Sequence, residues 1–246
     1  MRNIAIKKKI NVRNEAFRIR NDPLRGFLEQ AYFASGPGGE RDRYEYAYYL
    51  YKSAMIRAFE QISALARYNA MREQGNGIRT PGRKRVAEKA RSLRPYFALD
   101  MSTALIQTRI LLDRVIALSR VFLVGAKLPS FTSFADHKKF LVRNSKLLAK
   151  HLEYANYIAT ETDWFETEVK FVRDKFIVHH GPKHFFLYTS DPDYRCNVYL
   201  NILALPTRSG QAMQHYKVNI WQLSYNIEYF LKWFAQYAAK AYAAKS

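Results

Sequence analysis

The chain has 246 residues, 48% of them hydrophobic, and its 40 Lys and Arg against 21 Asp and Glu give a net charge of +19. This composition is enough for one large domain with a hydrophobic core or for two small ones, and one domain is favoured. The charge favours a phosphate polyanion as the partner, with nucleic acid preferred over an anionic membrane. The apolar runs are too short to span a bilayer and the N-terminus lacks a signal-peptide pattern, so we expect a cytoplasmic protein without a membrane partner. The single cysteine, Cys196, excludes an internal disulfide.

Residues 1–39 are predicted to form a basic N-terminal arm and loop. Lysines and arginines are scattered through the first part without a sustained period, and the run Ser35-Gly36-Pro37-Gly38-Gly39 marks a loop. A solvated terminus explains the same charges equally well. No linker rich in Gly, Ser or Pro divides the remainder, so residues 40–246 are predicted to form a single domain.

Three long helices are predicted next, over residues 40–73, 101–124 and 135–158. The first carries a wide apolar face rich in tyrosine. One interpretation is that these tyrosines stack on nucleic-acid bases. The favoured interpretation is that they are half-buried core residues whose hydroxyl groups reach solvent. The second helix is apolar almost all round, which indicates a central position in a bundle or at a dimer interface. On it, Arg109 and Asp113 are predicted to form a structural ion pair.

Residues 74–85, with the sequence QGNGIRTPGRKR, are predicted to form a Gly/Pro loop between the first two helices. A mobile basic loop can grip a phosphate backbone, and Arg83, Lys84 and Arg85 are placed for that role. An ordinary solubilising loop has the same composition.

A β-hairpin is predicted near residues 183–204, after the helices. Its strands, over residues 183–190 and 195–204, are rich in Phe, Tyr, Val and Leu and flank a turn at Pro192. A last helix over residues 214–244 follows. The expected fold class is therefore all-α, a bundle of long up-and-down helices with a small β-hairpin insertion.

Several kinds of catalytic site are absent from the sequence. It contains no GxxxxGK[ST] phosphate loop, no GxGxxG turn and no HExxH motif. Its carboxylates lack the paired pattern that two-metal phosphoryl transfer needs. His179, His180 and His184 have no Asp, Glu or Cys at ligand spacing and lie in a cationic stretch, so neither a metal nor another cofactor is predicted.

The stretch Glu161–Pro182, ETDWFETEVKFVRDKFIVHHGP, combines an amphipathic helix with a cluster of ionisable groups. Asp163 followed by Glu166 predicts the start of the helix, and the Gly-Pro pair predicts its end. Between them, apolar residues recur every three or four positions as one stripe that faces a core: Phe165, Val169, Val172 and Phe176.

A cation, a carboxylate and two imidazoles gather near the C-terminal end of this helix: Arg173, Asp174, His179 and His180. His179 continues the apolar stripe, so a core or capping histidine is the alternative to a catalytic one. On an ideal helix His180 is the residue aligned with Arg173.

The run Arg173-Asp174-Lys175-Phe176-Ile177-Val178-His179-His180 resembles the Arg-x(4–6)-His motif of the HEPN superfamily, which comprises all-helical proteins of toxin and abortive-infection type. In that family a polar residue typically follows the arginine, as Asp174 does here. The resemblance covers the motif and its helical context over roughly residues 101–180, and the arm, hairpin and last helix lie outside it. Arg208 and His215 match the same spacing without that context.

The resemblance implies a metal-independent endoribonuclease whose site forms at a homodimer cleft from the arginine and histidine of two subunits. It also implies a toxin or antiviral defence effector, with a cognate antitoxin or defence partner. RNA cleavage of this kind needs a base for the 2′-hydroxyl, an acid for the 5′-oxygen and positive charge on the phosphorane. The expected products are a 2′,3′-cyclic phosphate and a 5′-hydroxyl.

The roles implied for this chain follow residue by residue. His179 is the acid/base, with His180 as its competitor; Arg173 binds the phosphate, and Asp174 orients either the arginine or the histidine. Other cations are predicted to bind RNA outside the reacting centre: Lys170, Lys175, Arg83, Lys84 and Arg85.

Two other functions are compatible with this sequence. A non-catalytic helical dimer would hold a nucleic acid or nucleotide with the cluster as a phosphate clasp, and would bind RNA without cleaving it in EDTA. A structural or partner-binding protein would co-purify with a partner and show no affinity for nucleic acid at moderate salt.

Overall fold

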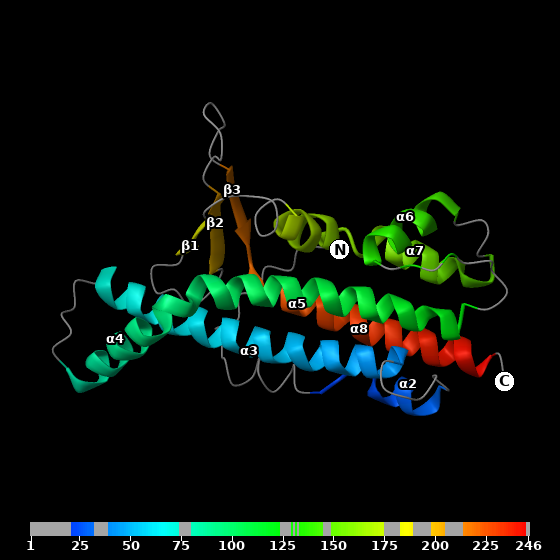
Figure 1. Cartoon of the computed structure of the whole chain (residues 1–246), viewed down its shortest axis with the longest axis horizontal. Helices are drawn as coiled ribbons and strands as arrows, with labels where there is room; N and C mark the ends of the chain where they lie inside the picture. Colours follow the sequence, from blue (N-terminus) through cyan, green and yellow to red (C-terminus); the bar gives the residue numbers. More distant parts are fainter. Residues whose placement is uncertain are drawn as a thin grey trace. The chain divides into compact units, whose positions relative to one another are not determined.

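The computed structural model describes residues 21–31, 39–73, 80–123, 129, 131, 133–144, 149–174, 183–188, 198–204 and 214–244. Most of these residues are helical, and three strands form a small antiparallel sheet (Figure 1). The prediction of a mostly helical protein with a small antiparallel β element is therefore confirmed. The chain divides into two compact units: unit 1 contains residues 53–105 and 171–224, and unit 2 contains residues 21–52, 106–170 and 225–246.

Unit 2 is built from helices around an aromatic core. Its elements are α2 (Arg25–Gln30), the first part of α3 (Glu40–Glu73), the second part of α5 (Phe97–Leu118), the 3-10 turn η2 (Ser119–Val121), α6 (Phe134–Asn144), α7 (Leu152–Thr160), the π-helix η4 (Phe165–Lys170) and most of α8 (Ile220–Ala243). The ring of Phe122 meets Phe27 and Phe234 edge-on, with centroids 6.3 and 5.5 Å away. Phe134 packs on Phe165 with centroids 4.5 Å apart. These buried rings supply the apolar area that holds the helices of the unit together.

Unit 1 combines helices with the sheet. Its elements are the second part of α3, α4 (Pro81–Leu93), the 3-10 turn η1 (Arg94–Tyr96), the first part of α5, β1 (Lys183–Tyr188), β2 (Tyr199–Ala204), β3 (Gln214–Val218) and the start of α8. Phe59 of α3 stacks on Trp221 of α8 with centroids 5.0 Å apart. Both rings are buried, so this contact joins the two helices within the unit.

The sheet has the order β1-β2-β3 with both pairs antiparallel. The hairpin prediction is confirmed for β1 and β2, which pair from Lys183 with Ala204 to Tyr188 with Tyr199. The strand β3 contradicts the prediction that the last helix begins at Gln214. The cause is the alternation in QHYKV: Tyr216 is half-buried and Val218 is buried, whereas His215 and Lys217 are exposed. Helical periodicity starts only at Ile220, where α8 begins.

The helix bounds differ from the predicted ones at two further places. The helix predicted over residues 101–124 begins earlier, at Phe97, and ends at Leu118 before η2. The helix predicted over residues 135–158 is two helices, α6 and α7. The last residue of α6, Asn144, donates from its side-chain amide to the Phe140 carbonyl at 3.0 Å, and such a bond competes with helix continuation.

The long first helix, α3, has the predicted bounds. Its tyrosines confirm the core interpretation in part: Tyr44, Tyr48 and Tyr51 are buried, whereas Tyr46 and Tyr49 are 66% and 59% exposed. Tyr44 also donates to Asp22 at 2.6 Å, so its hydroxyl group is satisfied in the interior. In the part of the chain that the structure describes, no helix has the length and apolarity needed to cross a membrane.

Candidate functional site

The segment that follows α7 carries the predicted site, and its helix is of the π type rather than the α type. After a turn at residues 161–163, π-helical backbone covers η4 and residues 172–174. A π-helix forms hydrogen bonds from residue i to i+5, so its turn is wider, and such turns occur frequently at functional sites. Phe165, Val169 and Val172 are all fully buried, which confirms the predicted apolar stripe as far as the described residues reach.

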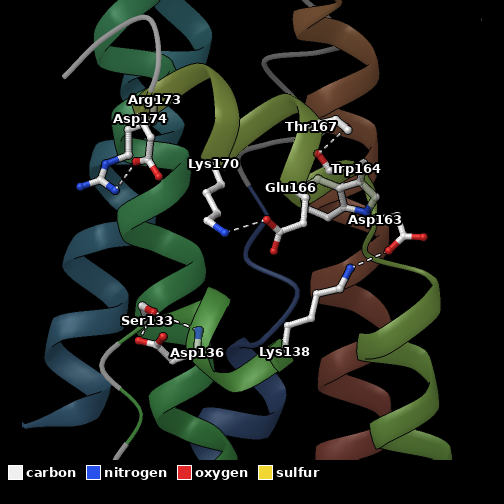
Figure 2. A network of polar contacts seen from close by, with 10 residues as sticks. All are labelled: Ser133, Asp136, Lys138, Asp163, Trp164, Glu166, Thr167, Lys170, Arg173 and Asp174. Carbon is white, nitrogen blue, oxygen red and sulfur yellow. Dashed lines mark hydrogen bonds and ion pairs between the residues drawn. The ribbon is translucent and has the colours of Figure 1, made fainter. Parts of the chain in front are cut away.

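Arg173 and Asp174 form an ion pair at the end of this segment (Figure 2). Nη1 of Arg173 donates to Oδ1 of Asp174 at 2.8 Å, and the two side chains are 38% and 33% exposed. A guanidinium has further N–H donors, so one bond to a carboxylate leaves others for a phosphate. Arg173 is thus accessible to solvent and is paired with Asp174.

The other half of the predicted cluster lies outside the described residues. This applies to Lys175 and to both candidate acid/base residues, His179 and His180, as well as to Phe176 of the stripe. The alignment of His180 with Arg173 assumed an α-helix, whereas the backbone is π-helical up to Asp174. Which histidine faces the arginine stays a prediction.

Lys170, predicted to bind RNA, pairs with Glu166 one helical turn earlier. The Nζ–Oε2 distance is 2.9 Å, and both side chains are about two-fifths exposed. An exposed pair of this kind contributes about 0.3–0.5 kcal/mol. A phosphate can therefore displace Glu166 from Lys170 at little cost.

The start of the segment is anchored to α6 by Lys138 and Asp163. Nζ of Lys138 donates to Oδ1 of Asp163 at 2.7 Å, although Lys138 is 9% exposed and Asp163 is 79% exposed (Figure 2). Asp163 was predicted to lie at the start of a helix, and η4 begins two residues later at Phe165. The backbone carbonyl of Asp163 accepts from the Glu166 N–H at 3.1 Å, while its carboxylate accepts from the ammonium group of Lys138. The ammonium group of the buried Lys138 therefore pairs with a carboxylate that lies at the protein surface.

The beginning of α6 is itself fixed by a cap. Oγ of Ser133 accepts from the Asp136 N–H at 3.1 Å and donates to the Asp136 carboxylate at 2.7 Å. The Phe134 N–H donates to Asp113 of α5 at 2.7 Å. These bonds satisfy two N–H groups of the first turn and so stabilise the start of α6, the helix that carries Lys138.

Arg109 and Asp113 pair within α5, as predicted for a structural ion pair. Nε of Arg109 lies 3.2 Å from Oδ2 of Asp113, and the guanidinium carbon lies 4.7 Å from the centroid of the Phe165 ring. The arginine is buried, so its charge is balanced by the carboxylate and by the face of the ring. This stack places the first residue of η4 against α5.

Sequence reasoning missed Glu168. Its Oε2 atom is buried without a hydrogen-bond partner, and burial raises the pKa of the carboxyl to about 7, against a smaller lowering by its hydrogen bond with Asn226 of α8. The signal was in the spacing, since Glu168 lies three residues after Phe165 and four before Val172 in the buried stripe. A carboxyl on that face must be taken out of water.

The predicted loop cations Arg83, Lys84 and Arg85 lie on a helix instead. Pro81 is at the first turn of α4, where a missing N–H costs nothing and the fixed φ angle suits a helix. The proline therefore starts the helix rather than marking a loop. Lys84 and Arg85 are exposed and Arg83 is half-exposed.

His215 was set aside in the sequence because its partner Arg208 lacked helical context, and Arg208 lies outside the described residues. His215 lies on β3, where its Nε2 donates to the Oδ1 atom of buried Asn201 at 2.7 Å. Its ring is parallel to that of Phe186 at 6.3 Å. These contacts give the histidine a role within the sheet.

Within the described ranges, no group of three or more His, Cys, Asp or Glu side chains is arranged to hold a metal ion. Comparisons of the chain with protein-family models, with curated proteins and with solved structures give no significant match.

Proposed function

We propose that this protein is a metal-independent endoribonuclease of HEPN type that acts on RNA in a homodimer. Arg173 binds the scissile phosphate, and His179 or His180 transfers the proton. The observation that supports the proposal is the Arg173 side chain, which is accessible and is held by the neighbouring Asp174. It lies in a chain of net charge +19, with five residues between it and His179.

This chemistry needs no metal because RNA supplies its own nucleophile. An imidazole that titrates near neutrality can take the proton of the 2′-hydroxyl group or give one to the leaving 5′-oxygen. The guanidinium of Arg173 forks onto two phosphate oxygens and stabilises the charge that grows on them. Asp174 keeps the fork oriented before the substrate arrives.

The test is cleavage of an end-labelled RNA in EDTA by the wild type and by three variants, Arg173→Ala, His179→Ala and His180→Ala. We expect Arg173→Ala to be slower by about 10²–10³-fold and the variant of the acid/base histidine by about 10²–10⁴-fold. Arg143→Ala, which removes an exposed arginine from α6, is the matched control and should cleave at the wild-type rate. Equal activity of all five proteins would refute the assignment.

Three further measurements separate this site from a contaminating nuclease. Arg173→Lys keeps the charge but loses the planar fork, so it should recover only part of the activity. The products should carry a 2′,3′-cyclic phosphate and a 5′-hydroxyl. If the site is composite, mixing Arg173→Ala with His179→Ala subunits should restore activity that neither variant has alone.

A non-catalytic nucleic-acid-binding dimer is the second candidate, and the Arg173–Asp174 pair is compatible with it. A guanidinium paired with one carboxylate keeps further N–H donors, so it suits a phosphate clasp as well as a catalyst. This function predicts that RNA binds in EDTA, that binding weakens in Arg173→Ala, and that no cleavage product forms with any of the proteins.

A further inference from the structure

The helix α4 presents a cationic face to solvent. Its buried side chains are Ala87 and Ala90. Four cations of the helix are exposed. Arg85 and Lys89 lie on the side opposite the buried alanines, and Lys84 and Arg91 lie beside them at spacings of three and four residues from Ala87. Glu88 is the single acidic residue of the helix. By contrast, α8 is nearly twice as long and carries two lysines and one glutamate.

This concentration of charge has a cost for the helix. Arg85 and Lys89 are four residues apart, so two like charges are neighbours on one face, and such a pair destabilises a helix. Apolar packing does not account for the cations either, because they are exposed. A bound polyanion would remove the repulsion, and its phosphates are the chemical complement of this face.

An exposed aromatic ring follows the cationic face. The helical backbone continues from α4 through η1 into α5 (Figure 1). Over this junction Arg94 is exposed, the Tyr96 side chain is 55% exposed, and Leu99 is 62% exposed. An accessible ring beside a row of cations is the combination by which proteins bind single-stranded nucleic acid, with phosphates on the cations and a base on the ring.

We propose that α4 and η1 form a docking surface for single-stranded RNA. The sugar-phosphate backbone lies along the cationic face, and an unpaired base stacks on Tyr96. A duplex fits less well, because its bases are stacked on one another and offer no free face to the ring. The inference rests on the proposed function and deepens it by naming the form of RNA that the nuclease receives.

Binding is measured with a fluorescent 2′-O-methyl RNA, which lacks the nucleophilic hydroxyl group and so reports binding whether or not the protein cleaves RNA. Anisotropy titrations in EDTA compare the single strand with its annealed duplex. We expect Arg85→Glu/Lys89→Glu to weaken single-strand binding by at least about tenfold and to lower the slope of log affinity against log salt by about 1.

The matched control reverses the same charges at the same spacing on another helix. Lys139 and Arg143 of α6 are exposed and four residues apart, so Lys139→Glu/Arg143→Glu changes the net charge equally. This control should bind close to the wild-type affinity. An equal loss in the control would overturn the proposal, because the effect would then come from net charge alone. If the glutamate variant fails to fold, Arg85→Gln/Lys89→Gln makes the same comparison.

Tyr96 tests the choice of single strand over duplex. Tyr96→Ala should weaken single-strand binding about tenfold and leave duplex binding unchanged, and Tyr96→Phe should bind as the wild type does. Equal effects on strand and duplex would overturn the stacking contact. An unchanged affinity of the α4 variant for RNA, combined with lost binding to phosphatidylserine vesicles, would assign the face to a membrane surface instead.

The outcomes separate this inference from the proposed function. Lost binding in the α4 variant without cleavage of ordinary RNA by the wild type supports the docking surface and overturns the nuclease. Cleavage by the wild type with full RNA binding in the α4 variant does the opposite.

Discussion

The two cationic regions of this protein hold their charges in different ways. The cations in or against the segment from Asp163 to Asp174 are paired with carboxylates: Lys138 of α6 with Asp163, Lys170 with Glu166 and Arg173 with Asp174. On α4, four cations are exposed near one glutamate: Lys84, Arg85, Lys89 and Arg91. A paired guanidinium is held in one orientation, which suits contact with a single phosphate. A row of exposed cations suits an extended sugar-phosphate backbone, because binding there depends more on the number of nearby cations than on the exact position of each one.

The energetic consequences of the two arrangements differ as well. Groups near the segment are buried or paired, so changing them alters the free energy of unfolding. The exposed cations on α4 are solvated, so we expect that changing them alters RNA binding and leaves the free energy of unfolding almost unchanged. Four measurements test this contrast.

The largest stability effect is expected at Glu168. Its folded pKa of about 7 lies above the usual 4.5, so the folded state binds the proton more tightly. The stability that this group contributes is present below pH 4.5 and is lost as the pH rises through 7. Glu168→Gln stays neutral, so we expect it to be more stable than the wild type by roughly 2–3 kcal/mol at pH 8. Thermal unfolding should show this as a rise in Tm of about 2–4 °C per kcal/mol.

The control for Glu168 is the pH itself. Near pH 5 most of the advantage of Glu168→Gln should vanish, because the wild-type carboxyl is then protonated in the folded state. A constant difference between the two proteins from pH 5 to pH 8 would contradict the raised pKa.

His137 should produce the opposite pH dependence. It is fully buried, burial lowers its pKa from 6.5 to about 3, and its Nε2 shares a hydrogen bond of 3.0 Å with the Tyr154 hydroxyl. Because its folded pKa is depressed, the stability is present above pH 6.5 and is lost as the pH falls. Urea unfolding should show a loss of about 2 kcal/mol from this residue between pH 7 and pH 5.

His137→Gln removes the titrating group while keeping a side chain that can hydrogen-bond to Tyr154. Its stability should fall less than that of the wild type between pH 7 and pH 5. Parallel pH profiles of the two proteins would show that His137 is not the cause.

Removing the partner of Lys138 should cost less than either titration. Asp163→Asn leaves a buried ammonium without its counter-charge, but Asp163 is exposed, so solvent compensates in part. We expect a loss of about 1–2 kcal/mol in urea unfolding. Lys138→Met combined with Asp163→Asn should recover most of it, and an additive double variant would mean that the two side chains are not coupled.

The smallest stability effect is expected on α4. Arg85→Glu/Lys89→Glu should unfold within about 0.5 kcal/mol of the wild type, as exposed side chains usually do. The same variant is expected to bind RNA more weakly, so a single protein would show weakened binding together with unchanged stability. A stability loss above that range would mean that the α4 cations are part of the folded framework.

Local patterns in the sequence were sufficient for much of the fold. The bounds of α3 follow from its continuous apolar face and from the absence of breaking residues between Glu40 and Glu73. The Arg109–Asp113 pair follows from two opposite charges one turn apart on an otherwise apolar helix. Strands β1 and β2 follow from their aromatic and β-branched composition.

Other features could not be predicted because they depend on distant partners. The strand β3 forms because β2 offers it an edge, and the short segment QHYKV lies directly before a helical run. The partner of Lys138 is Asp163, 25 residues later in the chain. Nothing local in α6 indicates that its lysine is buried.

For the candidate site, the sequence by itself determined the residue types, their spacing and the positive charge, since these are properties of the covalent chain. The tertiary structure alone decided the surroundings of each cation: Lys138 is buried and paired with Asp163, Arg173 is half-exposed and paired with Asp174, and most of the α4 cations are exposed to solvent. The physical reason is that burial and pairing depend on how much water and which opposite charges surround a group. Burial and pairing are both determined by residues that are close in space but distant in the sequence.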